Sequence, residues 1–480
     1  MNLSRRNFFK LAGASAVGVT MLSPLEALYA RRANGQVVGL TGGYGPLAPK
    51  MPKNADELVG LVRGGINLGT TPLLQLPPGF NYTAISIIEQ PMNDGRIVPG
   101  AHDGMAAFDG PKNTTILVRN HELSPSLTNG INVSPRYDQI GGGTTTIVVG
   151  PNRRVKKHFV SLGGTIRNCA GGRTPWGSWI SCEENLTLPG TGGAMKKHGY
   201  NFEVPATDKI QVADPIPLVA MGRFNHEAVA VDPESGWIYE TEDDGNSCFY
   251  RFRPNVRPTK YGDLQTSGDG VLEALAIKGM FKVDTGTNFL QYKNQPLEVE
   301  WVKIDNVDPA TNSTATSVRV QGQNKGAAIF RRGEGAYYAN GLIYFTCTSG
   351  GNPVPRTIDG VVQPLIGQGQ VFAYKPNNND PNSGTITLIV ESPAENVLNY
   401  PDNITVAPFG DLFLCEDGTN TEYVIGVTPQ GDLYRFAANA INDSEFAGAC
   451  FSPDGHTMFV NIQTPGITCA IWGPWSRNRA

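Results

Sequence analysis

The chain has 480 residues, of which 40% are hydrophobic and 17% charged, and its 39 Lys and Arg against 43 Asp and Glu give a formal net charge of −4. A mildly acidic chain without a run of basic residues is not typical of a nucleic-acid-binding protein, so we expect no nucleic-acid partner. The length exceeds that of a usual single domain, although a fold built from repeated small sheets can reach this length as one domain.

The first 30 residues are predicted to be a targeting segment. Residues 5–10 (Arg-Arg-Asn-Phe-Phe-Lys) lead into an apolar, small-residue run at 11–22, which is the order of a twin-arginine (Tat) signal. This run is shorter than the roughly 20 apolar residues that a membrane span needs, and residues 28–30 (Leu-Tyr-Ala) offer a cleavage site. We therefore expect export with the Tat translocase as partner, a periplasmic or secreted protein, and no stable membrane anchor. An accidental arginine pair on a buried helix is the alternative.

The remaining chain is divided at residue 75. Residues 31–75 are rich in Gly and Pro and are interpreted as an N-terminal extension without chemistry, and residues 76–480 as one catalytic domain. Seven cysteines, with no CxxC pair and no zinc-ribbon spacing, leave at least one thiol unpaired. In an oxidising compartment a metal-bound thiolate would account for such a thiol.

One sequence motif recurs along this domain: a turn, a short apolar strand, and a cluster of polar residues where the strand ends. Its copies are residues 115–122, 177–184, 236–243, 341–348, 410–417 and 455–461. Several copies follow another strand and a tight turn, which is how a propeller blade begins. The sequence therefore predicts an all-β fold, a six-bladed β-propeller with a metal site in its central channel. A two-sheet sandwich is the alternative, because turn spacing alone does not separate the two.

Acidic residues recur at the ends of these predicted strands. If equivalent strands point at one axis, residues in the same phase of each repeat converge, and few basic residues lie near enough in sequence to neutralise them. Bound cations are then expected, and carboxylate oxygens favour hard ions such as Ca²⁺, Mn²⁺ or Fe³⁺. The alternative is that each acid only closes a turn at the solvent edge. The candidate metal ligands are Glu122, Glu183, Glu184, Glu227, Glu242, Asp243, Glu334, Asp402, Asn403, Glu416 and Asp417.

Cys169 is a further candidate ligand. It precedes Ala170-Gly171-Gly172, and two glycines allow the backbone to approach a cofactor closely. A thiolate among carboxylates points to a redox-capable transition metal, although a lone buried cysteine is more often a small hydrophobe. His121 and His226, each within an Asn-His-Glu phrase, are candidate bases or ligands, or side chains that orient the adjacent glutamate.

Arg332 lies two residues before Glu334. On an extended strand, positions two apart share a face, which predicts a guanidinium beside a metal-ligating carboxylate. Metal ions with a forked cation make a phosphate site, whereas the alternative is an ordinary surface Arg–Glu pair. The sequence has no GxSxG, Walker or HExxH motif, so a serine hydrolase, a P-loop enzyme and a zincin receive no support.

The residues from Asn168 to Trp179 (Asn-Cys-Ala-Gly-Gly-Arg-Thr-Pro-Trp-Gly-Ser-Trp), followed by Cys-Glu-Glu-Asn at 182–185, resemble the PhoX-type alkaline phosphatases. Further segments resemble the family in the family's order: 222–227, 241–244, 332–336 and 401–403. The resemblance covers most of residues 80–475.

The resemblance implies a six-bladed propeller whose channel holds Fe³⁺ and Ca²⁺ and which hydrolyses phosphomonoesters, so that small-molecule phosphate esters are its partners. Position by position, Cys169, Glu227 and Glu334 would bind iron, Arg332 would contact the phosphate, and the other acids would share calcium binding and support. Cys169, Arg332 and Glu334 are therefore the predicted catalytic residues. The chain is shorter than usual for the family, so it is expected to lack some of the family's insertions, which often shape the substrate pocket. A different substrate preference, or a family member without phosphatase activity, is therefore a further alternative. The alternatives are another propeller hydrolase (a phosphodiesterase, a phytase-like enzyme or a lactonase) and a non-catalytic, calcium-binding secreted propeller.

Overall fold

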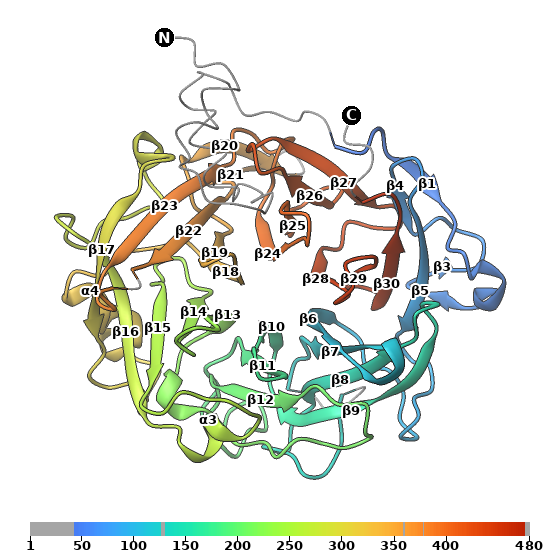
Figure 1. Ribbon diagram of the computed structural model, residues 1–480, viewed down its shortest axis with the longest axis horizontal. Helices are drawn as coiled ribbons and strands as arrows, with labels where there is room; N and C mark the ends of the chain where they lie inside the picture. The colour runs from blue at the N-terminus through green and yellow to red at the C-terminus, as the bar shows by residue number, and fades with distance from the viewer. Residues whose placement is uncertain (1–42, 126–129, 359–360, 378, 476–480) are drawn as a thin grey trace, which may run out of the picture.

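The computed structural model describes residues 43–125, 130–358, 361–377 and 379–475 (Figure 1). The predicted signal at 1–30 lies outside these residues. Antiparallel strands make up most of the structure, with short helices such as α3 (Asp263–Thr266) and α4 (Val318–Asn324) in the connections. Among the helices within the described ranges, none has the length and apolar character needed to cross a membrane.

The strands form small sheets arranged around a central axis (Figure 1). One four-stranded sheet contains β6 (His102–Asp109), β7 (Thr115–His121), β8 (Gly142–Val149) and β9 (Val155–Thr165). A three-stranded sheet contains β10 (Asn168–Arg173), β11 (Ser178–Glu183) and β12 (Asn201–Pro205). A second four-stranded sheet contains β28 (Phe446–Phe451), β29 (Met458–Ile462), β30 (Ile467–Trp472) and β5 (Asn81–Ile87).

Two larger sheets complete the circle. The nine-stranded sheet runs in the order β13 (His226–Val231), β14 (Ile238–Glu242), β15 (Tyr250–Pro254), β16 (Gly270–Ile277), β17 (Leu297–Lys303), β23 (Gly384–Glu391), β22 (Gln370–Pro376), β19 (Leu342–Cys347) and β18 (Gly333–Ala339). The six-stranded sheet runs in the order β1 (Ala48–Lys50), β4 (Leu74–Leu76), β27 (Leu433–Asn439), β26 (Tyr423–Val427), β25 (Leu412–Glu416) and β24 (Pro401–Val406). Because β4 pairs with β27, the predicted division at residue 75 falls inside a strand of this sheet.

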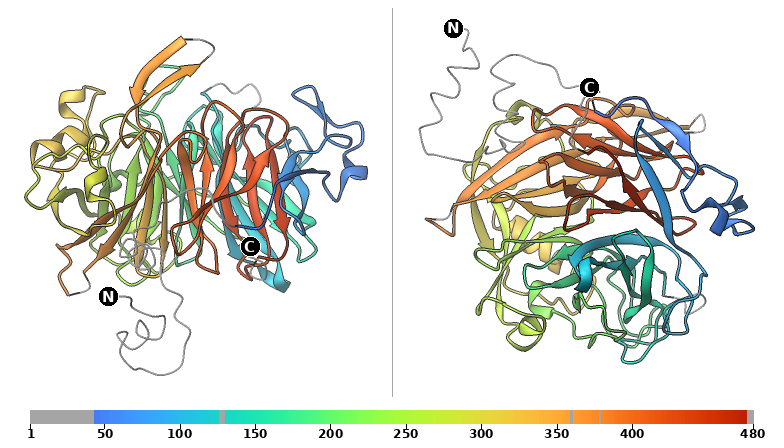
Figure 2. Two further views of the ribbon diagram at one scale, coloured as in Figure 1. Left: turned by 90° about the horizontal axis from the view of Figure 1, so that it is seen from above. Right: turned by 45° about the vertical axis from the view of Figure 1, so that its right-hand side comes forward.

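The inner edges of these sheets close a ring around the axis. Strand β6 contacts β10, and the contacts continue through β13, β18, β24 and β28 back to β6. Figure 2 shows the resulting disc from the side, with the hairpin of β20 (Val354–Ile358) and β21 (Val361–Ile366) rising from one face. The all-β prediction is confirmed, and the arrangement is that of a propeller rather than of a two-sheet sandwich.

Each inner strand carries an irregularity near its start. The pairing with the next strand shifts register directly after the first paired residue, as between His102 and Met105 in β6 and between His226 and Val229 in β13. The same shift occurs in β10, β18 and β24, whereas in β28 it follows the second paired residue, Ala447. A β-bulge bends its strand and redirects a side chain, so in the other five inner strands this feature turns the second residue away from the regular pleat.

Aromatic side chains pack against one another on the faces of the sheets. The rings of Phe249 and Phe345 stack with centroids 4.1 Å apart, and Phe345 stacks on Phe372, its cross-strand partner in β22, at 5.3 Å. Trp475 lies against Phe80 and Phe436, which attaches the C-terminal end of the described chain to the first strands. Such packing holds the sheets rigidly, and the inner strands therefore present their first residues in fixed positions.

Candidate metal centre

Acidic and thiol side chains gather at the end of the channel where the inner strands begin. The second residue of five inner strands belongs to this group: Asp103 in β6, Cys169 in β10, Glu227 in β13, Glu334 in β18 and Asp402 in β24. Glu445 stands directly before β28. The repeated bulge thus places one ligand-type side chain per strand at the same height of the channel.

A second set of acids comes from the strands paired with the inner ones. Glu122, Glu184, Asp243 and Asp417 each follow directly after the last residue of β7, β11, β14 and β25. Their backbone N–H groups make the same hydrogen bond, to the carbonyl oxygen of the residue before the neighbouring inner strand. The donors and acceptors are Glu122 to Ala101 (3.0 Å), Glu184 to Arg167 (3.0 Å), Asp243 to Asn225 (3.1 Å) and Asp417 to Tyr400 (2.9 Å). One repeated bond therefore fixes these acids beside the first set.

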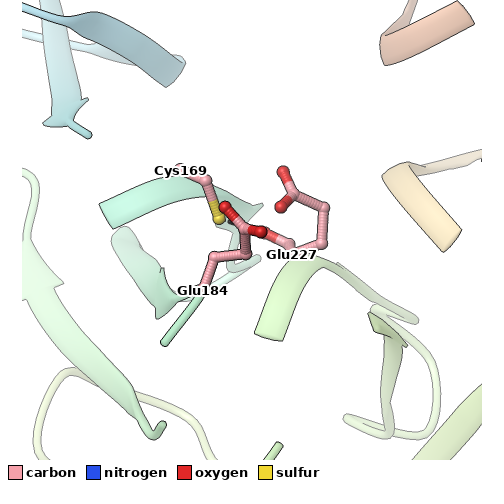
Figure 3. Close-up of side chains that lie close together, drawn as sticks. All are labelled: Cys169, Glu184 and Glu227. Carbon is pink, nitrogen blue, oxygen red and sulfur yellow. Dashed lines mark hydrogen bonds between the residues drawn. The ribbon is translucent and has the colours of Figure 1, made fainter. Parts of the chain in front are cut away.

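The two sets combine into groups that have metal-binding spacing, with ligand atoms all within 4.8 Å of one another. In the described residues the groups are Cys169–Glu184–Glu227, Glu227–Glu334–Asp402, Asp402–Asp417–Glu445 and Asp103–Glu122–Glu445. Figure 3 shows the first group, with both carboxyl groups directed at the sulfur. Glu227, Asp402 and Glu445 each belong to two groups, so the groups form a chain joined by shared carboxylates.

Burial makes this cluster costly without cations. Glu227 and Glu334 are both 3% exposed, and burial together with neighbouring acids raises the pKa of each well above its usual value. Burial and Asp417 raise the pKa of Asp402 to about 8, and burial, offset by Arg167, leaves the pKa of Glu184 at about 7. Crowded carboxyl oxygens beside a thiol suit bound cations, because a cation removes both the repulsion and the desolvation penalty.

Arg332 reaches the cluster by a different geometry from the predicted one. It does not lie on the strand, which begins at Gly333, and its backbone is left-handed with φ 53°. Its guanidinium donates to both oxygens of Asp243, with Nε to Oδ1 at 2.9 Å and Nη2 to Oδ2 at 3.1 Å, and Nη2 also donates to Glu334 Oε1 at 2.7 Å. The expected contact with Glu334 is present, but a turn creates it and not a shared strand face.

A family model described as alkaline phosphatase PhoX matches residues 63–466. The chain belongs to the PhoX alkaline phosphatase family. The structure also matches that of Pseudomonas fluorescens PhoX in complex with vanadate, a transition state analogue, with a TM-score of 0.66 and 17% identity over 91% of this chain and 98% of that chain. At this identity the likeness shows a shared fold. Membership of the PhoX family implies an exported, metal-dependent phosphatase acting on phosphate esters.

More distant structures match with lower scores. The PQQ domain of pyranose dehydrogenase from Coprinopsis cinerea has a TM-score of 0.38 at 10% identity, covering 83% of this chain and 97% of that chain. A gluconolactonase from Xanthomonas campestris has a TM-score of 0.35 at 12% identity, covering 92% of this chain and 99% of that chain. These scores are too low to bear on activity. No curated protein matches the sequence.

Three predicted ligands lie outside the cluster of this PhoX family member. Glu183 accepts hydrogen bonds from His198 Nδ1 (2.7 Å) and from backbone amides such as Ile166 N (2.9 Å). Glu242 pairs with Arg319 and Tyr250, and Glu416 accepts from the amides of Asn399 and Tyr423. Each is the residue before a clustered acid, and successive side chains of a strand point to opposite sides. Alternation along the strand therefore separates Glu183 from Glu184, Glu242 from Asp243 and Glu416 from Asp417.

Asn403 and the two histidines have supporting positions. Asn403 donates to Asp402 Oδ1 at 2.8 Å and accepts from Gly448 N at 2.6 Å, so it orients a clustered acid without joining a group. His226 Nδ1 lies 3.2 Å from Glu240, and its Nε2 donates to Gly222 O at 3.0 Å. His121 contacts Gly100 O and the buried Arg119.

Sequence reasoning missed three residues of the site: Asp103, Glu445 and Arg167. Asp103 had a usable signal, because His102-Asp103-Gly104 places an acid before glycine as Gly333-Glu334-Gly335 does. The first predicted repeat begins at residue 115 and so leaves out β6, the strand that carries Asp103. Glu445 precedes its strand and has no counterpart in the other repeats, and only the folded structure brings it to Asp402 and Asp103.

Proposed function

We propose that this protein is a secreted phosphomonoesterase with an iron and calcium centre in the channel of a six-bladed β-propeller. Support for six blades comes from the six inner strands of the described chain, each with a bulge near its start, and from the six sequence repeats, which coincide with β7, β11, β14, β19, β25 and β29. The nine-stranded sheet then counts as two blades whose outer strands, β17 and β23, pair edge to edge. Support for export comes from the Tat-type residues 5–22.

The chemical type of each ligand atom, sulfur or oxygen, indicates which metal each group would bind. Cys169, Glu227 and Glu334 would hold Fe³⁺, because a thiolate selects a transition metal. The oxygen-only groups would hold Ca²⁺, with ligands from Asp103, Glu122, Asp402, Asp417 and Glu445. Glu184 shares the group of Cys169, and Asp243 lies outside the four groups of the described residues and accepts from Arg332 with both oxygens, so these two acids would support the centre. When bound, these ions supply positive charge that neutralises the phosphate and the charge developing in the transition state. The observation that carries the proposal is the chain of buried and half-buried groups joined by shared carboxylates.

Arg332 would be the positively charged side chain that contacts the phosphate. Its two bonds to Asp243 fix the plane of the guanidinium, and in the described part of the chain Nη1 is left for a phosphate oxygen. Glu334 raises the pKa of Arg332 above its usual value, so the side chain stays protonated at any working pH. A planar, fixed donor of this kind binds a phosphoryl group in the transition state without reorganisation.

Two adjacent arginines test this role. Arg332→Ala should lower kcat for p-nitrophenyl phosphate by about 10²–10³ while iron and calcium stay bound, because one preorganised donor is lost. Arg332→Lys keeps the charge without the planar fork and should recover part of that loss. Arg331→Ala is the matched control, since Arg331 binds Asp284, Gly245 and Asn246 outside the cluster.

A comparison of substrates tests the proposed function itself. Purified protein with its metals should cleave the monoester faster than bis-p-nitrophenyl phosphate or a lactone. Equal turnover in wild type and Arg332→Ala would remove Arg332 from the site. Cleavage of only the diester or the lactone would replace the monoesterase by one of the other propeller hydrolases.

A further inference from the structure

Arg167 occupies the same place before β10 that Arg332 occupies before β18. Each directly precedes an inner strand and has left-handed backbone, with φ 44° for Arg167 and 53° for Arg332. The carbonyl oxygen of Arg167 accepts from Glu184 N at 3.0 Å, and that of Arg332 accepts from Thr348 N at 2.9 Å. Ala101 and Tyr400, directly before β6 and β24, are also left-handed, so this turn is a repeated feature of the inner strands. The two guanidinium groups therefore leave from equivalent turns at the mouth of the channel.

The contacts of Arg167 mirror those of Arg332. Its Nη2 pairs with Glu184 Oε2 at 2.6 Å and with Glu122, so it joins acids of two neighbouring sheets. Arginine keeps its positive charge in proteins, so the Arg167 guanidinium is charged. The Arg167 and Arg332 side chains are 38% and 34% exposed. Both are thus held by carboxylates and still reachable from the channel mouth.

The two arginines stand on either side of Glu227. Arg167 binds Glu184, which shares one group with Cys169 and Glu227. Arg332 binds Glu334, which shares the next group with the same Glu227. A phosphoryl group placed over the shared carboxylate would therefore have one guanidinium on each side. Among the described contacts, Arg167 uses only Nη2, which leaves its Nε and Nη1 for substrate oxygens.

We propose that Arg167 is a second substrate-contacting arginine, and that Arg167 and Arg332 together clamp the phosphoryl group and select monoesters over diesters. This inference rests on the proposed phosphatase function. A monoester dianion has three peripheral oxygens and two negative charges, whereas a diester has two such oxygens and one charge. Two guanidinium groups in addition to bound cations match the dianion, and a charge-assisted bond to the third oxygen is one that a diester cannot make.

The experiment compares two arginines at opposite ends of β10. Arg167→Ala should lower kcat/KM for p-nitrophenyl phosphate by about 10²–10³, and it should lower the monoester-to-diester ratio of kcat/KM at least about tenfold. Arg167→Lys should recover part of the monoester activity. Arg173→Ala is the matched control, because Arg173 ends β10 at the other end of the channel, with its guanidinium 5.3 Å from the Phe108 ring centroid.

Two further measurements separate substrate contact from simple charge balance among the acids. Iron and calcium content should be unchanged in Arg167→Ala, and titration calorimetry should show weaker binding of inorganic phosphate by the metal-loaded variant. An unchanged monoester-to-diester ratio with unchanged phosphate affinity would overturn the inference, and so would a loss of activity that follows metal loss alone. A wild type without phosphatase activity would overturn the proposed function instead, so the two failures are distinguishable.

Discussion

The two ends of the central channel are built from the same six strands and have opposite chemistry. At one end the second residues of the strands are acids and a cysteine. One to four residues further along, the same strands turn small and apolar and line a cavity of about 420 Å³. The lining residues there include Gly104, Ala106, Ala228, Ala230, Ala336 and Ala449.

This contrast separates what makes the fold from what makes the site. Apolar burial between and along the strands favours folding at both ends of the disc. At the acidic end, buried like charges oppose folding unless cations or arginines neutralise them. A propeller with this cluster is therefore expected to be least stable where it is functional, and bound metal should reverse that.

The largest expected effect is from Glu227→Gln, since Glu227 belongs to two groups at once. Losing a ligand shared by two ions should cost more than the roughly 10–100-fold that loss of a supporting partner costs in metal affinity or activity. In metal-free protein the same change should raise the melting temperature, because glutamine carries no charge to bury. Differential scanning calorimetry should show a lower melting temperature for Glu227→Gln than for wild type when metal is present, and a higher one in excess chelator.

The neighbour Ala228 provides the control for this prediction. Ala228→Ser changes a residue that lines the apolar cavity and should leave metal content and turnover near wild type. A Glu227→Gln variant that keeps its full metal content, or that melts lower than wild type when both are metal-free, would contradict the comparison.

A smaller effect is expected from replacing one cysteine by serine at each end of the channel. Cys169 lies 3.3 Å from His226 O in the cluster, whereas Cys450 lines the apolar cavity. Cys169→Ser should fold but lose iron, the visible absorption of an iron–thiolate bond and most activity, since a hydroxyl is a poor substitute for a thiolate. Cys450→Ser should keep all three. An unchanged spectrum in Cys169→Ser would exclude this cysteine as the iron ligand.

The smallest expected effect concerns the carboxylate that faces away from the channel. His198 bridges Glu183 at 2.7 Å and Asp138 at 3.3 Å. Burial lowers the pKa of His198, but these two carboxylates raise it more, so the pKa lies above its usual value. The folded state then binds the proton more tightly, and the stabilisation is complete below about pH 6.5 and is lost as pH rises through the folded pKa.

Denaturant unfolding of wild type and His198→Gln between pH 5.5 and 8.5 measures this stabilisation. The difference in unfolding free energy should be largest at the acidic end of that range and should decline above about pH 6.5, with metal content unchanged. The exposed His456→Gln is the matched control. Loss of metal from His198→Gln would return Glu183 to the set of ligands.

Much of the fold followed from the sequence because turns and strand ends are local signals. The predicted repeats at 177–184 and 236–243 contain β11 and β14, and each repeat ends on the residue directly after its strand. The site followed less completely. Strand alternation separates Glu183 from Glu184, and the acid before glycine marks Asp103, but the turn that directs Arg332 depends on backbone geometry that no residue pattern specifies. Arg167 meets Glu122 only because two sheets pack side by side.

The most direct test of the account is metal analysis of the purified, undenatured protein together with its visible spectrum and its melting temperature. The account predicts bound iron and calcium, an iron–thiolate absorption band, and a chelator-dependent fall in both activity and melting temperature, because ions that bind only the folded state stabilise it. A colourless protein that contains neither metal and melts at the same temperature in excess chelator, while still hydrolysing phosphomonoesters, would contradict it.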